Sequence, residues 1–579
     1  MEKFKYLIVG GGVAGITAAE FIRLNDLEGS IAMISDEPYP FYSRLLLSKP
    51  GFFLGKIPFD SIWLKNEAWY QEKKITYLKG RKAVKLDAGA KIITLDDGQQ
   101  LGYEKLLLAL GTESRPWNVP GSDRKGVYYL RDLDEGKQVM EGIKTAKKGI
   151  TIGGAFVSFE MAELLKLAGL DTTIIIRGPY YWQSLLDEAS GKMIEDALVK
   201  HEIRMIKNAE VQEVLGGDQV TGVVLKDGAK LDCDMVICGI GTLTYMDWLK
   251  EAGLKTNRGI LANEYLETNL PDIWVAGDAA EFNDIVVGAT VQLGNWANAR
   301  EHGRVCGLNM VGKHEQFRFV SFYTTQALGL SVTFVGDVRP GPEKSVITRG
   351  SPEVNSYGRI LIAGGKIIGA TLMNRTQELN TISKLIEQGF LVAGHEAELG
   401  DSNFDLKTLV VLPSKKEEAP FEKIKVGWFS FSCCEDNTVV MTEVMNDHWQ
   451  EWKKIFDFRH ARVLKTNNIF DEFDVSFIEG AVASPGHEET IKQIREKSKK
   501  IVAVGACAIT GLPAGQRNNF TDDQKASIDF LITKFGALPK VKTVAEVIKV
   551  DVEIPGCPMD PKVFLEKVTA LVKELRPNL

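Results

Sequence analysis

Short apolar runs that end in glycine recur through the first 280 residues of the chain. The first run, residues 6–9, is followed by a helix-like stretch and by a second run, residues 31–35, that ends at two acids. Similar runs occupy residues 103–111, 149–152, 234–241 and 272–280. Short apolar runs bounded by glycine are typical of strands buried on both faces of a parallel sheet. Because they alternate with helical stretches, they predict α/β domains.

The turn after the first predicted strand has the spacing of a dinucleotide-binding loop. Gly10 allows a sharp turn, Gly12 lets the backbone approach a pyrophosphate, and Gly15 lets the following helix pack on the strand. The free N–H groups and the dipole at that helix N-terminus favour phosphates. An acid about 20 residues further on accepts the adenosine ribose hydroxyls, and Asp36 and Glu37 stand at that distance. These residues predict a bound dinucleotide.

The pattern changes after residue 318. Residues 319–394 alternate strand-like apolar runs with turn signals and end in a helix, which predicts an α+β domain. Residues 396–423 are charged and contain prolines, which predicts a linker, although residues 406–413 could pack on another part of the chain. A new α/β pattern begins at Lys425.

The composition is that of an ordinary globular protein. Of the 579 residues, 44% are hydrophobic and 25% are charged, and the net charge is −7. This charge argues against nucleic acid or an anionic membrane as the main partner. No apolar run approaches the ~18 residues of a membrane span, and the N-terminus leads directly into a strand. We therefore expect a cytoplasmic protein.

Four of the seven cysteines lie in the last 150 residues. They are Cys433, Cys434, Cys507 and Cys557, and each lies near the predicted carboxyl end of a strand. Ligands of open α/β sheets gather beyond these ends, so the four thiolates could converge. Four cysteine ligands suit an iron–sulfur cluster or zinc. The other three cysteines, which we expect in the core, are Cys233, Cys238 and Cys306.

Over about residues 1–395, the order of motifs resembles the pyridine nucleotide–disulfide oxidoreductase superfamily, in particular its NADH:rubredoxin reductase and ferredoxin reductase branch. The resemblance implies two Rossmann-like dinucleotide-binding domains and an interface domain. It implies that Arg44 and Lys49 lie beside the flavin of FAD, that Asp278 meets its ribityl chain, and that Trp296 lies near its isoalloxazine ring. The implied FAD contacts are Gly10, Gly12, Ala14, Gly15, Asp36, Glu37, Arg44, Lys49, Ala109, Gly111, Gly277, Asp278 and Trp296.

Two departures from the family pattern matter. The family's disulfide reductases carry a CxxxxC motif near the flavin, and this chain has no cysteine in its first 232 residues. We therefore do not expect it to reduce a disulfide through a dithiol of its own. In the second nucleotide-binding unit, Ile176 stands where an acid normally binds the NAD ribose, and Arg177 follows it. Arg177 could meet the 2′-phosphate of NADPH, or the site could have decayed.

The remaining residues of the second nucleotide-binding unit are interpreted from the same resemblance. Residues 153–158 replace the usual GxGxxG pattern, whereas Glu160, on the nicotinamide side, is retained. Lys49 and Glu160 are the candidate catalytic residues. The candidate NAD(P)H contacts are Gly153 and Arg177, and Gly241, at the start of the second FAD-binding segment, is a further candidate cofactor contact.

The C-terminal cysteine pattern resembles the cluster-binding small subunit of [NiFe] hydrogenases and its homologue in respiratory complex I. The matching pieces, across about residues 424–579, are SCCEDN, DVSFIEGAV, VAVGACAITG and EIPGCPMDP. The resemblance implies one [4Fe–4S] cluster on Cys433, Cys434, Cys507 and Cys557. The adjacent pair is the complex I arrangement, because Phe431 stands where many hydrogenase small subunits begin a C-x-x-C motif.

We therefore predict an α/β protein with two Rossmann-like domains, an α+β interface domain and a C-terminal flavodoxin-like iron–sulfur domain. The expected segments are an FAD-binding domain in two parts (1–115 and 241–315), an NAD(P)-binding-like domain (116–240), the interface or dimerisation domain (316–395), the linker (396–423) and the iron–sulfur domain (424–579).

The expected function is electron transfer between NAD(P)H, FAD and a [4Fe–4S] cluster, to or from a hydrogenase-like or complex I-like large subunit. One alternative is a docking subunit with a non-functional NAD(P) site, and another is a stand-alone reductase of a soluble carrier such as ferredoxin. A flavin oxidase with an appended structural domain is the weakest alternative, because all four expected cysteines are present. A homodimer through the interface domain remains open.

Overall fold

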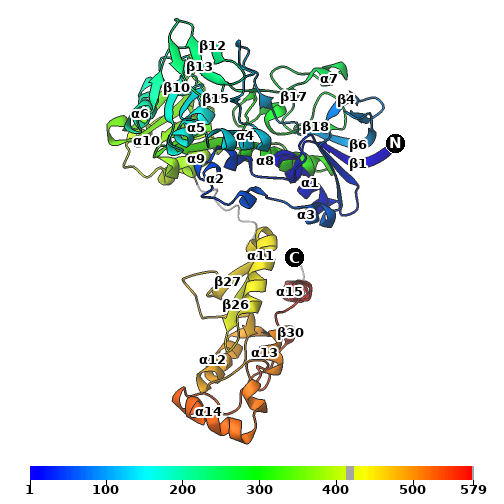
Figure 1. Ribbon diagram of the computed structural model, residues 1–579. Coiled ribbons are helices and arrows are strands. Elements are labelled where there is room, and N and C mark those ends of the chain that lie inside the picture. The colour runs from blue at the N-terminus through cyan, green and yellow to red at the C-terminus, as the bar shows by residue number, and fades with distance from the viewer. Residues whose placement is uncertain (412–422, 577–579) are drawn as a thin grey trace. The chain divides into compact units, whose positions relative to one another are not determined.

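The computed structural model describes residues 1–411 and 423–576. The chain divides into two compact units, Met1–Leu412 and Pro413–Leu579 (Figure 1). Each unit is described by itself.

The first sheet of the N-terminal unit carries the glycine-rich turn. Its parallel strands are β3 (Ile75–Lys79), β2 (Ile31–Ser35), β1 (Glu2–Val9), β6 (Gln100–Leu108) and β18 (Ile273–Val275), and the antiparallel strands β5 (Ile92–Leu95) and β4 (Ala83–Asp87) continue from β6. The strand β2 is buried over its whole length, as its apolar sequence predicts. The carboxyl ends of the parallel strands therefore meet at one edge of this sheet.

Two helices of the N-terminal unit pack closely on each other. They are α1 (Val13–Asn25) and α8 (Trp296–Met310) (Figure 1). A Cβ atom on Gly303 would lie 2.3 Å from the carbonyl oxygen of Ala14, and one on Gly307 would lie 2.7 Å from that of Ala18. The two glycines, one helical turn apart, therefore set the distance between the helices.

The second sheet is entirely parallel. Its strands are β11 (Arg204–Ile206), β10 (Asp171–Ile175), β9 (Lys148–Ile152), β15 (Met235–Cys238) and β8 (Val127–Tyr128). Helix α5 (Phe156–Leu167) connects β9 to β10. The first unit thus contains two α/β sheets, one mixed and one parallel, which confirms the predicted α/β class.

The third large sheet of this unit is antiparallel. Its strands are β21 (Phe322–Ala327), β22 (Leu330–Gly336), β25 (Lys366–Met373), β24 (Ser356–Ala363) and β23 (Ser345–Ser351). Helix α9 (Leu379–Glu387) packs on β22 and β25 through its buried apolar side.

The predicted linker, residues 396–423, begins too early. Helix α10 (Glu396–Gly400) and the 3-10 helix η6 (Leu406–Leu409) bury Leu399, Leu406 and Leu409 in the apolar core of the antiparallel sheet. The linker start at residue 396 was wrong because this stretch is charged in sequence yet places Leu399 inward, whereas the alternative that residues 406–413 pack on the chain is confirmed for Leu406 and Leu409. Residues 412–422 of the predicted linker lie outside the described residues.

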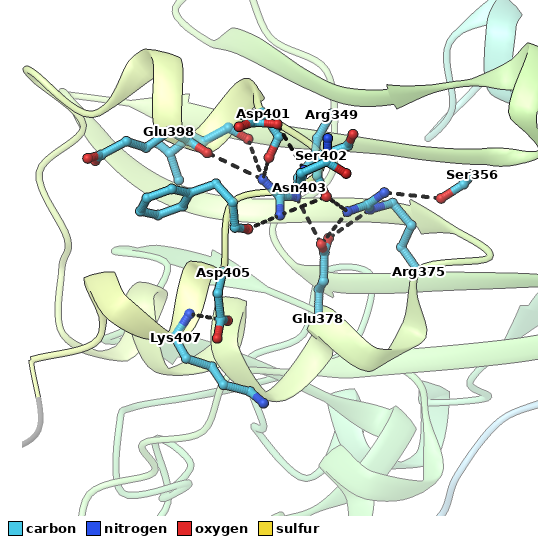
Figure 2. A network of polar contacts seen from close by, with 12 residues as sticks. Arg349, Ser356, Arg375, Glu378, Glu398, Asp401, Ser402, Asn403, Asp405 and Lys407 are labelled. Carbon is cyan, nitrogen blue, oxygen red and sulfur yellow. Dashed lines mark hydrogen bonds and ion pairs between the residues drawn. The ribbon is translucent and has the colours of Figure 1, made fainter.

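Two buried arginines fix this segment (Figure 2). Arg349 on β23 is 3% exposed, forms a 2.9 Å ion pair with Glu378, and donates to backbone carbonyls between residues 398 and 404. Arg375 also pairs with Glu378 and donates to the carbonyl of Ser402. The arginines thus satisfy carbonyl groups at the end of α10 and between α10 and η6, where no helix or strand supplies a donor.

The C-terminal unit is built on one parallel sheet. Its strand order is β27 (Phe456–Ala461), β26 (Ile424–Ser430), β28 (Phe473–Glu479), β29 (Ser498–Val504) and β30 (Val552–Ile554). Helices α11 (Asp436–Ile455) and α15 (Pro561–Leu575) share one apolar core with the sheet, whereas α12 (Pro485–Glu496) and α13 (Gly505–Thr510) share another. The sheet is therefore covered on both faces.

Among the helices of the described ranges, none combines the length and the apolar character needed to span a lipid bilayer.

Candidate functional site

A cleft of about 270 Å³ opens at the carboxyl edge of the first sheet. The predicted site residues in its lining are Gly10, Gly12, Ala14, Asp36, Glu37, Arg44, Ala109, Gly111, Glu160, Gly277, Asp278 and Trp296. Five other predicted residues do not line it: Gly15, Lys49, Gly153, Arg177 and Gly241. The structure thus brings together residues that lie nearly 290 positions apart in the sequence.

The glycines of the first turn have distinct structural roles. Gly10 has a φ of 124°, and a Cβ atom there would lie 2.0 Å from the carbonyl oxygen of Ala109. Gly15 packs behind the cleft, where a Cβ atom would lie 2.0 Å from the carbonyl oxygen of Gly10. Gly12 faces open space and begins α1 without a side-chain cap. The free N–H groups of α1 are therefore available to an anion in the cleft.

The acid that ends β2 is held by two neighbours. The Tyr42 hydroxyl donates to Glu37 Oε2 at 2.5 Å, and Arg44 forms an ion pair with Glu37 Oε1. Burial raises the pKa of Glu37 above its ordinary value, and the Arg44 guanidinium acts in the opposite direction. Asp36, the neighbouring acid, is exposed at the edge of the cleft.

Sequence reasoning did not identify Arg131, a charged residue of the cleft lining. Its Nη2 lies 2.9 Å from Asp278 Oδ2, and its Nε donates to the Thr112 carbonyl at 2.8 Å. The Thr112 hydroxyl, also in the cleft lining, is buried without a hydrogen-bond partner in the described structure. This unpartnered hydroxyl and the Arg131–Asp278 pair give the cleft polar groups that a polar ligand could engage.

Two aromatic pairs line the same cleft. Trp296 stacks on Phe41 with ring centroids 5.7 Å apart and planes 19° apart. The ring centroids of Phe156 and Tyr323 lie 4.1 Å apart. These rings provide flat apolar walls on a cleft whose floor is the glycine-rich turn.

Lys49 and Glu160 form an ion pair beside the cleft. Lys49 Nζ lies 2.7 Å from Glu160 Oε1, and the Thr325 hydroxyl donates to the same oxygen at 2.7 Å. Lys49 follows the 3-10 helix η1 (Arg44–Ser48), Glu160 lies on α5 and Thr325 on β21. The Glu160 carboxylate, 3% exposed, therefore joins three parts of the first unit.

The other residues of the second nucleotide-binding unit lie apart from this cleft. Gly153 has a φ of 120°, and a Cβ atom there would lie 2.2 Å from the carbonyl oxygen of Gly239. Ile176 is 2% exposed and belongs to an apolar cluster that includes Trp182. Arg177 is exposed and makes no hydrogen bond or ion pair within residues 1–411 and 423–576. Gly241, with a φ of 98°, borders open space.

The four late cysteines follow three strands of the C-terminal sheet, of which β29 and β30 are neighbours and β26 is separated from β29 by β28. Cys433 and Cys434 follow β26, Cys507 lies on α13 after β29, and Cys557 follows β30. Cys433 and Cys507 pack on the same small cluster around Ala481. Burial raises the pKa of Cys433 to about 11, and the nearby Glu479, Cys434 and Cys507 act in the same direction. Burial also raises the pKa of Cys507, and Cys557 and Cys434 lie close enough to it to act in the same direction.

As the side chains lie, no three His, Cys, Asp or Glu residues in the described ranges converge closely enough to hold a metal ion. The donor set of four cysteines is one that iron–sulfur clusters use.

Backbone contacts hold the three cysteine loops side by side. The N–H of Ala506 donates to the Gly556 carbonyl at 2.7 Å, which joins the loops of Cys507 and Cys557. Asn437, which is 7% exposed, accepts the N–H of Met559 at 2.8 Å. Gly505 has a φ of 81°, and a Cβ atom there would lie 2.3 Å from the amide nitrogen of Asn437. Asn437, three residues after Cys434, therefore contacts the segments that carry Cys507 and Cys557, a role that sequence reasoning did not assign.

Comparison with known families divides the chain in the same way. A family model described as pyridine nucleotide-disulphide oxidoreductase matches residues 4–303, more than half of the chain. A model of the rubredoxin NAD+ reductase C-terminal domain matches residues 324–390. A model of the NADH ubiquinone oxidoreductase 20 Kd subunit matches residues 434–571.

Individual relatives cover the N-terminal unit. The nitrite reductase [NAD(P)H] of Bacillus subtilis (strain 168) is 29% identical over 391 residues, which are 67% of this chain and 48% of that protein. This chain thus spans about half the length of the first curated relatives it matches. The rubredoxin-NAD(+) reductase of Pseudomonas putida is 28% identical over 307 residues, covering 53% of this chain and 80% of that protein.

A solved structure agrees with these matches. The ferredoxin reductase for the CYP199A2 system from Rhodopseudomonas palustris is 27% identical, with a TM-score of 0.66, and covers 71% of this chain and all of that one. The glycine-rich turn and most residues of the cleft lining lie within the part of the chain that the family model matches. The chain belongs to the pyridine nucleotide-disulphide oxidoreductase family.

Proposed function

We propose that this chain is an FAD-dependent NAD(P)H oxidoreductase that exchanges electrons with a [4Fe–4S] cluster in its C-terminal unit. The observation that carries the proposal is the cleft at the carboxyl edge of the first sheet. There the glycine-rich turn, Glu37, Asp278 and Trp296 meet beside the Lys49–Glu160 pair. The names of two relatives, a nitrite reductase [NAD(P)H] and a rubredoxin-NAD(+) reductase, support the use of a nicotinamide cofactor.

The residues of the cleft fit FAD. The open face of Gly12 and the uncapped N-terminus of α1 suit the pyrophosphate, and Glu37 suits the adenosine ribose. Asp278, positioned by Arg131, suits a ribityl hydroxyl. When bound, FAD supplies both two-electron and one-electron chemistry, and a [4Fe–4S] cluster supplies one-electron transfer. The Trp296–Phe41 stack and the Phe156–Tyr323 pair would shield the reacting ring from water.

Lys49 and Glu160 are proposed as the catalytic pair. Because Glu160 is almost fully buried and shared with Thr325, it holds the Lys49 ammonium at one place on the rim of the cleft. With the cofactors bound, an ammonium held at this place would be able to orient the nicotinamide against the flavin.

The C-terminal unit is proposed to be a flavodoxin-like domain that binds the cluster through Cys433, Cys434, Cys507 and Cys557. Its strand order, with β26 between β27 and β28, is the order of flavodoxin-like sheets. The match of residues 434–571 to the complex I 20 Kd subunit supports a large-subunit partner of the complex I or hydrogenase kind. The segment boundaries of the sequence analysis belong to the same proposal, except that residues 396–411 join the N-terminal unit. A homodimer through residues 316–395 is part of it as well.

A second candidate is an electron-transfer subunit without NAD(P)H activity. Two observations favour it. Ile176 is buried, and the ring centroids of Phe156 and Trp182 lie 5.1 Å apart. Apolar side chains therefore occupy the region where an NAD ribose would be bound. A third candidate, a reductase of a diffusible carrier such as ferredoxin, rests on the match to a ferredoxin reductase structure.

Anaerobic titration of the purified flavoprotein separates the candidates. We expect NADH or NADPH to bleach the flavin, with NADPH favoured through Arg177, and we expect Lys49→Met to slow the bleaching. The exposed Lys56→Met is the matched control and should leave the rate unchanged. Flavin that neither nucleotide bleaches would reject the proposal in favour of the second candidate.

A further inference from the structure

The C-terminal unit has a cavity that the proposed function does not use. Its volume is about 750 Å³, within the roughly 300–1,000 Å³ of small-molecule sites. It lies at the carboxyl end of β26, where the strand order β27-β26-β28 changes direction. Ligands of open α/β sheets bind at this kind of position. The four late cysteines are not part of its lining.

Aromatic rings form the walls of this cavity. Phe429 and His460 stack with centroids 4.4 Å apart and planes 19° apart, and Phe431 lies 5.2 Å from His487. Phe470, in the loop between β27 and β28, is 37% exposed and packs edge-on against Phe429 at 5.9 Å. A flat ring could enter beside Phe470 and contact aromatic faces on more than one side.

Among the polar side chains of the cavity lining, His460 and Glu435 can accept hydrogen bonds from a ligand. The His460 Nδ1 lies 3.3 Å from the Trp428 carbonyl, so this nitrogen carries the proton. Burial lowers the pKa of His460, so the ring is neutral near pH 7 and its Nε2 accepts hydrogen bonds. The Glu435 carboxylate is a second acceptor in the lining. Both groups suit the N–H donors of a heteroaromatic ring.

Arg462 is the cationic side chain in the lining of this cavity. Arg462 is exposed and close enough to His460 to affect its pKa, yet it makes no hydrogen bond or ion pair with any residue that the structure describes. A guanidinium with five free donors at the rim of an aromatic cavity suits a phosphate or carboxylate. We propose that this cavity binds a planar heteroaromatic ligand that carries an anionic group, the chemical class of a mononucleotide.

The test uses the full-length holoprotein, saturated with FAD so that the N-terminal cleft is occupied. Calorimetric titration with FMN and with AMP measures binding, and riboflavin and adenosine are the matched probes without phosphate. We expect saturable binding of FMN or AMP. Arg462→Gln should weaken the binding of the phosphorylated probe about tenfold and leave that of its uncharged counterpart unchanged.

A second variant tests the aromatic wall. Phe470→Ala should weaken both members of a probe pair at least about fivefold, because stacking on an aromatic ring is lost. Lys525→Gln, on the exposed helix α14 (Asp522–Lys534), removes the same charge outside the lining and should change nothing. The absence of saturable FMN and AMP binding would overturn the proposal. So would binding that neither Arg462→Gln nor Phe470→Ala affects.

Discussion

At the scale of single residues, a few side chains each hold several others in place. Glu37, at the end of β2, is one of them. Its carboxylate accepts a hydrogen bond from the Tyr42 hydroxyl and forms an ion pair with Arg44. Glu37→Gln removes the charge while keeping the shape, so we expect FAD affinity to fall roughly 10- to 100-fold, the usual value of a hydrogen bond to a charged group. Fluorescence titration of apoprotein with FAD measures this. The exposed Glu72→Gln is the control, and equal affinities of the two variants would refute the role of Glu37.

Asn437 is the corresponding residue of the C-terminal unit. Its side chain contacts the loops that carry Cys507 and Cys557, and it lies three residues after Cys434. Asn437→Ala should weaken cluster retention roughly 10- to 100-fold, as the loss of outer-shell partners does at other metal sites. Iron and sulfide analysis after gel filtration measures the loss, and flavin content should be unchanged. Retention of the full iron content by the variant would show that the loops hold without Asn437.

At the scale of elements, the strands of the parallel sheets were predictable because burial on both faces leaves short apolar runs between glycines. The predicted run at residues 31–35 coincides with β2, and the run at 149–152 lies within β9. The attachment of residues 396–411 was not predictable, because Arg349 binds backbone carbonyls, which have the same chemistry in every sequence. The role of Arg131 was not predictable for a related reason. Its partner Asp278 lies 147 residues away in the sequence, and no local motif marks the pair.

The contact between α1 and α8 gives a prediction at this scale. Gly303→Ala would place a methyl group 2.3 Å from the Ala14 carbonyl, so the helices must separate. We expect a loss of about 1–3 kcal/mol in the free energy of unfolding, the usual cost of overpacking. FAD affinity should fall as well, because Ala14 lies in the cleft lining. Urea unfolding measures the first effect. Gly217→Ala, where a Cβ atom meets open space, is the control and should stay within about 0.5 kcal/mol of the parent.

At the scale of the whole molecule, the family matches place a flavin-type reductase and a complex I-type domain on one chain. Four cysteines that could hold one cluster follow the strands of the second unit, and the sequence has no pair of CxxC motifs that could hold nickel and iron. An electron relay with one flavin and one cluster needs an outlet. Under the proposed function, a large subunit of the complex I or hydrogenase kind would supply one, and a diffusible carrier is the rival.

Native purification decides between these two outlets. We expect a large subunit to co-purify with the chain and to be identified by mass spectrometry. The exposed Glu435, next to Cys434, begins α11 with a φ of 65° and should face that partner. Glu435→Lys should therefore reduce co-purification, because it reverses a charge at the contact surface. Glu566→Lys, the same change on the exposed side of α15, should not. If the parent chain is instead found alone and transfers electrons to ferredoxin at full rate, the diffusible carrier is the outlet and the large-subunit proposal fails.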